Sequence, residues 1–447
     1  MADPWIFLLA GASLVLLGFV AAQLFDRFRI PDYFVLMAIG LVLGSGLLPL
    51  GGVDPRASLA SIAPLLTNIA LAFILFEGGL VLHLRGMGPV WSVAAAHTAT
   101  AMGLTILGIW VAGTLLLGFH STTALILALA FCGPSATIVL SFLPRSGVEA
   151  RTRFTLTVEG VMGNIIATVL VIMLVRLPGE VTGSAPWVPF LLNVGAAALV
   201  AYVVAEAWAK AVGGSKPRSF SFMTSVALAV FLYAIGEGFL GGNGGLAAFV
   251  FGLVLGHRRV LRAPHPEVPG SRGLQEFHRE LVFLLRTFFF LYLGLRVSPA
   301  GITEGALLAA IGFALIFYLS RLPSSLALAR RWRLPPLDAG ILRATVARGM
   351  TDTVLILYAI EAGVISATEA GPVTDLLFLV IVVAATLSAA LVMMTEHTAH
   401  RLASMGHRAP PAESPEGAPP TDRVPRDLDR AIAQFLDDPI VRRGHID

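Results

Sequence analysis

The chain has 447 residues, of which 56% are hydrophobic and only 13% are charged. This composition excludes an ordinary soluble globular protein and indicates one that crosses a membrane many times. The net charge is only +3, and the basic residues are sorted along the chain rather than clustered, so we expect no nucleic-acid partner.

Thirteen apolar segments follow one another along the chain, separated by Gly, Pro and charged residues. Each is long enough to cross a membrane, which takes about 20 apolar residues in a helix. The expected spans are 5–25, 33–50, 60–82, 89–117, 121–144, 154–175, 186–209, 220–238, 239–256, 276–295, 300–320, 338–361 and 372–395. The stretch "GEGFLGGNGG" between the eighth and ninth spans fits either a tight turn or a break inside one span. The first span is expected to be retained, because "MADPWIF" has no basic residue typical of a signal peptide.

Lys and Arg are distributed unequally between the connections. The odd-numbered connections contain 18 of them, counting Arg321 in the eleventh, and the even-numbered ones contain 3. By the positive-inside rule, the N-terminus is expected outside and the C-terminus in the cytoplasm.

The composition changes near residue 400. We expect residues 1–400 to form the transmembrane domain and residues 401–447 a cytoplasmic tail. "APPAESPEGAPPTDRVP" is typical of disorder, and "RDLDRAIAQFLDD" predicts a short amphipathic helix after it. The tail is either mobile or docked on the cytoplasmic face, and the sequence leaves both open.

Several polar side chains fall inside predicted spans. A charged side chain at the centre of the bilayer costs on the order of 3 kcal/mol, so each is a candidate functional residue. The charged candidates are Glu77, Glu159, Glu237, Arg286, Arg348 and Asp352, and the neutral ones are His97, Asn164 and Asn243.

Two spans contain residues that interrupt a helix. In the fifth, "AFCGPSATIV" places a Gly-Pro pair in mid-span, and in the twelfth, "RATVARGMTDTVL" places a glycine between Arg348 and Asp352. Either break alone also fits a kink in a packing helix. Interrupted helices in both halves are typical of transporters built from inverted repeats, whose half-helix ends line a site at the midplane. The predicted crossing point lies around 132–137 and 348–352.

Five segments, in their order and spacing, carry a family resemblance. They read "RIPDYFVLMAIGLVLG", "FEGGLVLHLRGM", "GGNGGLAAFVFGLVLG", "RTFFFLYLGLRVS" and "ARGMTDTVLIL". Together they resemble the monovalent cation:proton antiporters, in particular the thirteen-helix, NhaP-like sodium/proton antiporters, over about residues 10–395. The resemblance implies a homodimer with an interface domain and a core domain, whose two crossed broken helices move like an elevator. It also favours the inner membrane of a prokaryotic cell.

The resemblance implies a site from which this chain departs. Family members usually carry Thr-Asp-Pro at the fifth-helix break, and in the sixth helix a Glu followed four and five residues later by Asn-Asp, whose Asp binds either a proton or the cation. Here the break reads Cys-Gly-Pro (132–134), and Glu159 is followed by Gly163-Asn164. An Asn can coordinate a cation but cannot exchange a proton, so another carboxylate must handle the proton.

Two carboxylates are candidates for that task. Glu159 is the first choice, although it also fits a solvated residue or a partner of Arg151 or Arg153. Asp352 is either a relocated carboxylate or half of an ion pair with Arg348, four residues earlier.

The remaining polar residues receive supporting roles. Arg286 is either a fixed countercharge to the site or a residue that reaches the cytoplasmic interface, and Glu77 is expected to pair helices. His97 is expected to be a satisfied polar group between helices, and Glu237 to be exposed to solvent. The predicted ion and proton site comprises Glu159, Asn164, Asp352, Gly133, Ser135 and Thr137, supported by Arg348, Arg286 and Glu77.

The expected function is exchange of sodium or potassium ions for protons across the bilayer. The alternative is a homologue that has lost exchange and acts as a sensor, scaffold or passive ion pathway. We expect a transporter rather than an enzyme, with no cofactor and no transition-metal site. An ATP-driven pump is disfavoured, because no Gly-rich phosphate-binding loop occurs in the sequence.

Overall fold

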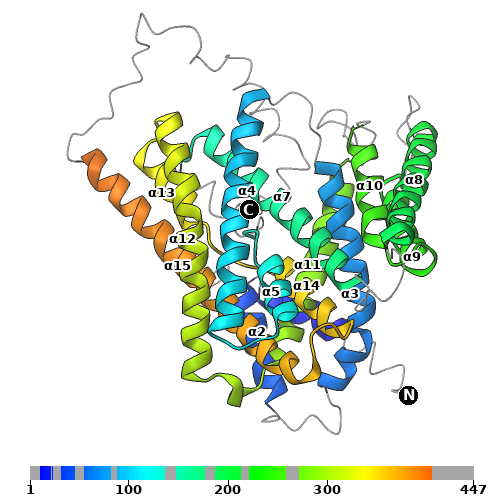
Figure 1. Cartoon of the computed structure of the whole chain (residues 1–447), viewed down its shortest axis with the longest axis horizontal. Helices are drawn as coiled ribbons and strands as arrows, with labels where there is room; N and C mark the ends of the chain where they lie inside the picture. The colour runs from blue at the N-terminus through cyan, green and yellow to red at the C-terminus, as the bar shows by residue number, and fades with distance from the viewer. Residues whose placement is uncertain are drawn as a thin grey trace, which may run out of the picture.

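A computed structural model of the chain describes residues 11–21, 23, 32–45, 55–81, 88–135, 147–176, 187–212, 221–257 and 271–404. Within these residues the regular elements are all helices (Figure 1). This is the structure that a bilayer favours, because a helix satisfies its backbone polar groups within its own segment.

The helices follow the expected order of apolar segments. After a helical stretch at 11–21, the first half contains α2 (Asp32–Gly44), α3 (Pro55–Val81), α4 (Gly88–Leu115), α5 (Ser121–Ala130) and α7 (Ala150–Arg176). The second half contains α8 (Trp187–Val212), α9 (Ser221–Phe239), α10 (Gly244–His257), α11 (Ser271–Arg296), the 3-10 helix η2 (Pro299–Gly301), α12 (Glu304–Trp332), α13 (Pro336–Ala344), α14 (Met350–Glu361) and α15 (Ala367–Ser404). In the described part of the chain, six helices are long and apolar enough to cross a membrane, within α3, α4, α7, α8, α12 and α15.

The open boundary between the eighth and ninth spans is a tight turn. Helix α9 ends at Phe239, and α10 begins five residues later at Gly244. Gly241 and Gly242 have positive φ angles of 65° and 79°, a conformation that glycine adopts without steric cost. The glycine-rich stretch therefore reverses the chain.

The predicted limits of the eleventh span were wrong. That span was expected to stop at residue 320, but α12 continues for three further turns to Trp332 and includes Arg321. The uninterrupted apolar pattern ends at residue 320 because Arg321 follows it. Since Arg321 is buried inside the helix rather than in a connection, it does not belong in the count of cytoplasmic charges. The asymmetry of 17 against 3 still favours the same orientation.

Helix α15 is also longer than the predicted span. It runs to Ser404, four residues past the expected end of the membrane domain, whereas the predicted tail helix lies outside the described residues.

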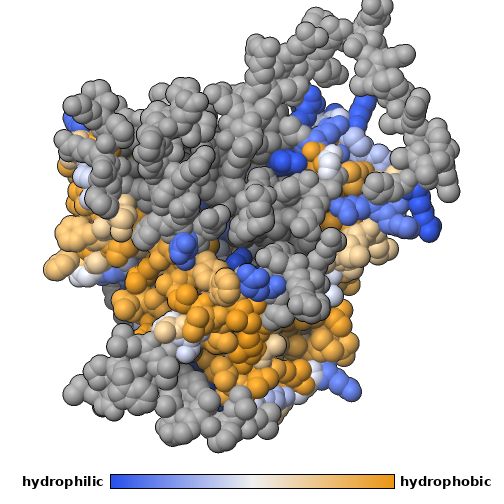
Figure 2. Space-filling model, turned by 180° about the vertical axis from the view of Figure 1, so that it is seen from behind, coloured by the Kyte–Doolittle hydropathy of each residue, from blue (hydrophilic) through white to orange (hydrophobic). Residues whose placement is uncertain are grey.

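The helices pack in two groups, which Figure 1 shows on opposite sides of the molecule. In one, α10 packs against α3, α8 and α9. In the other, α12 packs against α4, α13 and α15, and α4 also packs against α5 and α7. Helix α14 contacts members of both groups. Hydrophobic residues cover much of the described surface seen in Figure 2, as expected where lipid replaces water.

Glycines allow close helix contacts outside the site as well. A Cβ at Gly40 of α2 would lie 2.9 Å from the Cα of Gly294 in α11, and one at Gly79 of α3 would lie 2.6 Å from the backbone nitrogen of Leu253 in α10. Such small residues let two backbones approach and gain van der Waals contact in a bilayer, where water supplies no hydrophobic force between helices.

Candidate functional site

The two interrupted helices meet where the sequence predicted. Helix α5 stops at Ala130, and the non-helical segment after it reaches the segment that separates α13 from α14. There the backbone N–H of Ser135 donates a hydrogen bond of 2.9 Å to the carbonyl of Ala347. The expectation that the two breaks meet is therefore confirmed, and the continuation of the fifth helix beyond Ser135 lies outside the described residues.

Helix α7 packs directly on this crossing through glycine. A Cβ at Gly133 would lie 2.9 Å from both the Cα and the carbonyl carbon of Gly163, and 3.3 Å from the backbone nitrogen of Asn164. Real Cβ atoms are almost never found at the shorter distance, so residues 133 and 163 must both remain small. The departures from the family pattern, Cys-Gly-Pro in one helix and Gly-Asn in the other, thus lie against each other.

The carboxyl end of α13 is satisfied by side chains from two other helices. The Leu342 carbonyl accepts hydrogen bonds from Nε and Nη2 of Arg321, at 3.0 and 2.9 Å. The Ala344 carbonyl accepts one from the Ser388 hydroxyl of α15, at 2.7 Å. Terminal carbonyls otherwise lack intrahelical donors, and a cation at this end also stabilises the helix dipole.

The amino end of α14 is capped by its own acid. Asp352, in the first turn of α14, accepts a hydrogen bond of 2.5 Å from the backbone N–H of Gly349, the residue just before the helix. Its carboxylate also lies at the positive end of the helix dipole. The spacing of four residues from Arg348 is not a helical one here, because residue 348 precedes α14.

Arg348 is held by an aromatic ring. Its guanidinium carbon lies 3.9 Å from the centre of the Phe317 ring of α12, a cation–π contact. The side chain is 2% exposed, and its Nε and Nη1 have no hydrogen-bond partner among the described residues. The predicted supporting charge therefore lies beside the break, between the two half-helices.

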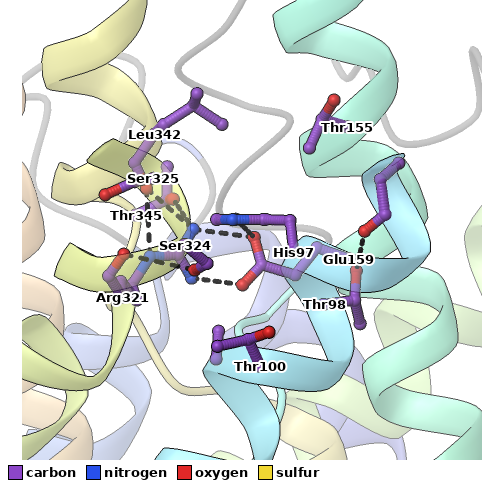
Figure 3. A network of polar contacts seen from close by, with 12 residues as sticks. His97, Thr98, Thr100, Thr155, Glu159, Arg321, Ser324, Ser325, Leu342 and Thr345 are labelled. Carbon is purple, nitrogen blue, oxygen red and sulfur yellow. Dashed lines mark hydrogen bonds and ion pairs between the residues drawn. The ribbon is translucent and has the colours of Figure 1, made fainter. Parts of the chain in front are cut away.

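Glu159 forms a bidentate ion pair with Arg321 (Figure 3). Its Oε1 and Oε2 accept from Nη1 and Nη2 at 2.6 and 2.7 Å, and Nη2 also donates to the Thr345 hydroxyl at 2.8 Å. Both side chains are at most 3% exposed. One arginine thus joins α7 to the end of α13, immediately before the break.

This pairing corrects the expected surroundings of Glu159. Solvent, Arg151 or Arg153 was expected beside Glu159, but its partner is Arg321, 162 positions away along the chain. Arg321 was missed because it was assigned to a connection. The signal that could have found it is its place in the run "IFYLSRLPSSLALA", which is apolar enough on both sides to be one continuous helix.

His97 of α4 approaches the same carboxylate (Figure 3). Its Nε2 lies 3.5 Å from Oε2 of Glu159, and the residue is 3% exposed. Neither ring nitrogen has a hydrogen-bond partner among the described residues. His97 thus lies between helices as expected, with Glu159 as its described polar neighbour, but the 3.5 Å contact is longer than a usual hydrogen bond.

The other predicted residues lie away from the crossing or outside the described chain. Arg286 forms an ion pair of 2.5 Å with Asp32 at the start of α2. Glu77 of α3 is half-buried, next to glycines that face α7 and α10. Thr137 falls outside the described residues, so the crossing is described only as far as Ser135.

A second polar cluster joins the two groups of helices at the other end of α7. Arg176, the last residue of α7, forms an ion pair with Glu237 of α9. Glu237 was expected to be exposed to solvent, but it is partly buried and forms this ion pair. Nearby, the Tyr233 hydroxyl of α9 donates to the Asn68 side chain of α3 at 2.7 Å, within one group.

The formal charges around the crossing balance. Glu159 is neutralised by Arg321, and Asp352 lies with Arg348 at the second break. Asn164, half-buried on α7, adds no charge where the family pattern would add a carboxylate. The described residues around the crossing therefore carry no excess negative charge.

Known proteins resemble this chain both in sequence and in structure. A family model described as "sodium/hydrogen exchanger, transmembrane" matches residues 11–395. A K(+)/H(+) antiporter NhaP from Alkalimonas amylolytica is 27% identical over 356 residues, which are 77% of this chain and 59% of that protein. A K(+)/H(+) antiporter NhaP2 from Shewanella baltica is 23% identical over 324 residues, 70% of this chain and 52% of that protein. The chain thus spans little more than half the length of these relatives.

A solved structure has the same fold. The sodium proton antiporter MjNhaP1 from Methanocaldococcus jannaschii, at pH 8, superimposes with a TM-score of 0.68 and 17% identity, covering 90% of this chain and 97% of the other.

Proposed function

This chain belongs to the sodium/hydrogen exchanger family and is an integral membrane protein, and from this premise we propose that it exchanges a monovalent cation for protons. The cation is sodium or potassium, because relatives named for each ion resemble the chain. The exchange is a secondary active transport that uses one ion gradient to drive the other ion.

The observation that carries this proposal is the contact between the two broken helices. Ser135 and Ala347 join the breaks, and Gly133 packs on Gly163 of α7 at the same place. Half-helix ends at one point provide backbone carbonyls and dipole ends that replace part of an ion's water shell. A single kinked helix would not create such a point.

Asp352 and Asn164 are the proposed ligands with distinct tasks. Asp352 is buried and ionisable, so a proton and a cation can compete for its carboxylate, whereas Asn164 offers only a neutral oxygen. Gly133, Ser135 and Thr137 supply further ligands around the fifth-helix break. Glu159 remains a proposed member of the site, although its bidentate pair with Arg321 favours holding the broken helix over binding the ion.

The supporting charges act on the framework of the site. Arg348 stabilises the twelfth-helix break, whereas Arg286 and Glu77 act at the packing of α2, α3 and α11.

The two groups of helices correspond to the two bodies of an elevator-type transporter. In this proposal α14, which carries Asp352, moves together with α4, α5, α7, α12, α13 and α15, and the group around α10 forms the interface of a homodimer. The N-terminus lies outside and the C-terminus in the cytoplasm of a prokaryotic cell, as the charge asymmetry favours.

A flux measurement tests the exchange directly. Purified protein is reconstituted into vesicles containing a pH-sensitive dye, and sodium or potassium chloride is then added outside. We expect cation-dependent proton flux in at least one salt, and a loss of at least about tenfold for Asp352→Asn, because removing a charge-assisted ligand contact costs about 1.5–3 kcal/mol. Glu304→Gln, an exposed carboxylate at the start of α12, serves as the control and should retain the flux. Absence of flux in both salts, from correctly inserted protein, would contradict the proposal.

The neutral Asn164 favours one other function, a homologue that no longer exchanges ions and serves as a sensor, scaffold or passive pathway. Asn164→Asp distinguishes the two. If only the variant exchanges cations for protons, the parent has lost the activity; if the parent already exchanges them, the proton is carried elsewhere in the chain.

A further inference from the structure

The proposed exchange leaves open which residues carry protons in a chain that has Asn164 in place of a carboxylate. Resting on that proposed function, we propose that His97 is a proton-binding residue of the exchange. A proton bound to His97 weakens the binding of a cation at Asn164 and Asp352, and the bound cation weakens the binding of the proton. The inference comes from the contact between α4, α7 and α12 drawn in Figure 3.

The first support is the environment of the imidazole. His97 is 3% exposed, and neither ring nitrogen has a hydrogen-bond partner among the described residues. A buried polar group without a partner is costly, and packing alone does not explain why a histidine occupies this position. A proton on Nε2 would place a donor 3.5 Å from the Glu159 carboxylate.

The second support is the set of charges around the ring. Helix α7 contributes Glu159 and α12 contributes Arg321, which already neutralise each other through two hydrogen bonds of 2.6 and 2.7 Å. Helix α5, which also packs on α4, has no ionisable residue in Ser121–Ala130, and α4 itself has no other charge within Gly88–Leu115. The carboxylate that faces the ring, Glu159, is therefore already paired with Arg321.

The third support is the position along α7. Glu159 and Asn164 are five residues apart on one continuous helix, a rise of about 7.5 Å. Unit charges on the order of 10 Å apart, in an effective dielectric constant of about 20, repel enough to weaken cation binding roughly 15-fold. A cation that binds near Asn164 therefore releases the proton from Nε2 of His97 to water on the side to which the site is open. This link lets cation and proton compete without sharing one ligand.

Proton release on cation binding tests this role without relying on transport. Purified protein in weakly buffered detergent solution receives sodium or potassium chloride, with choline chloride as the salt control, while a dye records the protons released. We expect His97→Gln to release fewer protons per bound cation than the parent and to lose the roughly 15-fold weakening of cation affinity at acidic pH. His257→Gln, an exposed histidine at the end of α10, is the matched control and should behave as the parent does.

The outcomes separate this inference from the proposed function. If His97→Gln releases as many protons as the parent and keeps its pH profile, His97 is only a structural residue. If the parent shows no cation-dependent proton flux in vesicles, the exchange itself is wrong, whatever His97 does. Should His97→Gln fail to fold, the infrared difference spectrum of the parent with and without the cation decides, because imidazole bands must appear in it, and their absence would overturn the inference.

Discussion

At the residue scale, the strongest interaction near the site is the buried pair of Glu159 and Arg321. Two charges leave water at a high cost, which their mutual attraction offsets only when geometry is good and the remaining donors are satisfied. Here the remaining donors of Arg321 reach the Leu342 carbonyl and the Thr345 hydroxyl. The pair therefore fixes the end of α13 relative to α7 rather than offering a vacant carboxylate to an ion.

Removing one member of the pair should cost more than removing both. Arg321→Gln leaves the Glu159 carboxylate buried without a cation, and we expect a loss of about 3–5 kcal/mol of stability. The double variant Glu159→Gln with Arg321→Gln should recover part of that loss, because no charge remains buried. Thermal unfolding in detergent measures both variants. A double variant less stable than Arg321→Gln would contradict this account of the pair.

At the element scale, interrupted helices meet because both breaks and the helix between them have small residues at the contact. Gly133 and Gly163 face each other at backbone distance, and the nearby bond from Ser135 to Ala347 replaces helical hydrogen bonds that the breaks give up. The half-helix ends are satisfied by groups from outside their own helices or at their caps, such as Arg321 and Asp352. Specific hydrogen bonds therefore stabilise the broken conformation of these helices.

Adding one methyl group at this contact should displace the crossing. In Gly133→Ala or Gly163→Ala the new Cβ would lie 2.9 Å from backbone atoms, which cannot move aside as a side chain can. We expect a loss of about 1–3 kcal/mol from overpacking, together with reduced cation-dependent flux.

A glycine in open space provides the control for that experiment. Gly103 of α4 is exposed, and a Cβ added there would have no heavy atom of another residue within 4 Å, so Gly103→Ala should be neutral or stabilise its helix by about 0.5–1 kcal/mol. Equal losses at all three positions would show that the effect is unrelated to the crossing.

At the scale of the whole molecule, an ion pair joins the two groups of helices at the end of α7. The ion pair of Arg176 with Glu237 connects α7 of one group to α9 of the other. The hydrogen bond of Tyr233 with Asn68 connects α9 and α3 within a single group. These two contacts give a matched pair of positions for testing relative motion.

Cross-linking between the groups should stop exchange. We expect Arg176→Cys with Glu237→Cys to lose cation-dependent proton flux after reaction with a short reagent that links two thiols, because the site-bearing group could no longer move. Asn68→Cys with Tyr233→Cys should retain flux after the same reaction, since both positions move together. The native Cys132 is buried, which limits its reaction. Full activity of the first variant after complete cross-linking would exclude the elevator motion.

The sequence alone determined the class of the protein, the order of its helices and the place of both breaks, because membrane insertion depends on local apolarity and a Gly-Pro pair interrupts a helix wherever it packs. It also indicated which carboxylate of the family pattern is missing at Asn164. Tertiary structure alone decided the partners of the remaining charges. Glu159 and Arg321 are 162 residues apart, and nothing local in either segment identifies the other. A buried charge is stabilised by whichever opposite charge the fold brings within hydrogen-bonding distance, and that proximity is a property of packing rather than of sequence spacing.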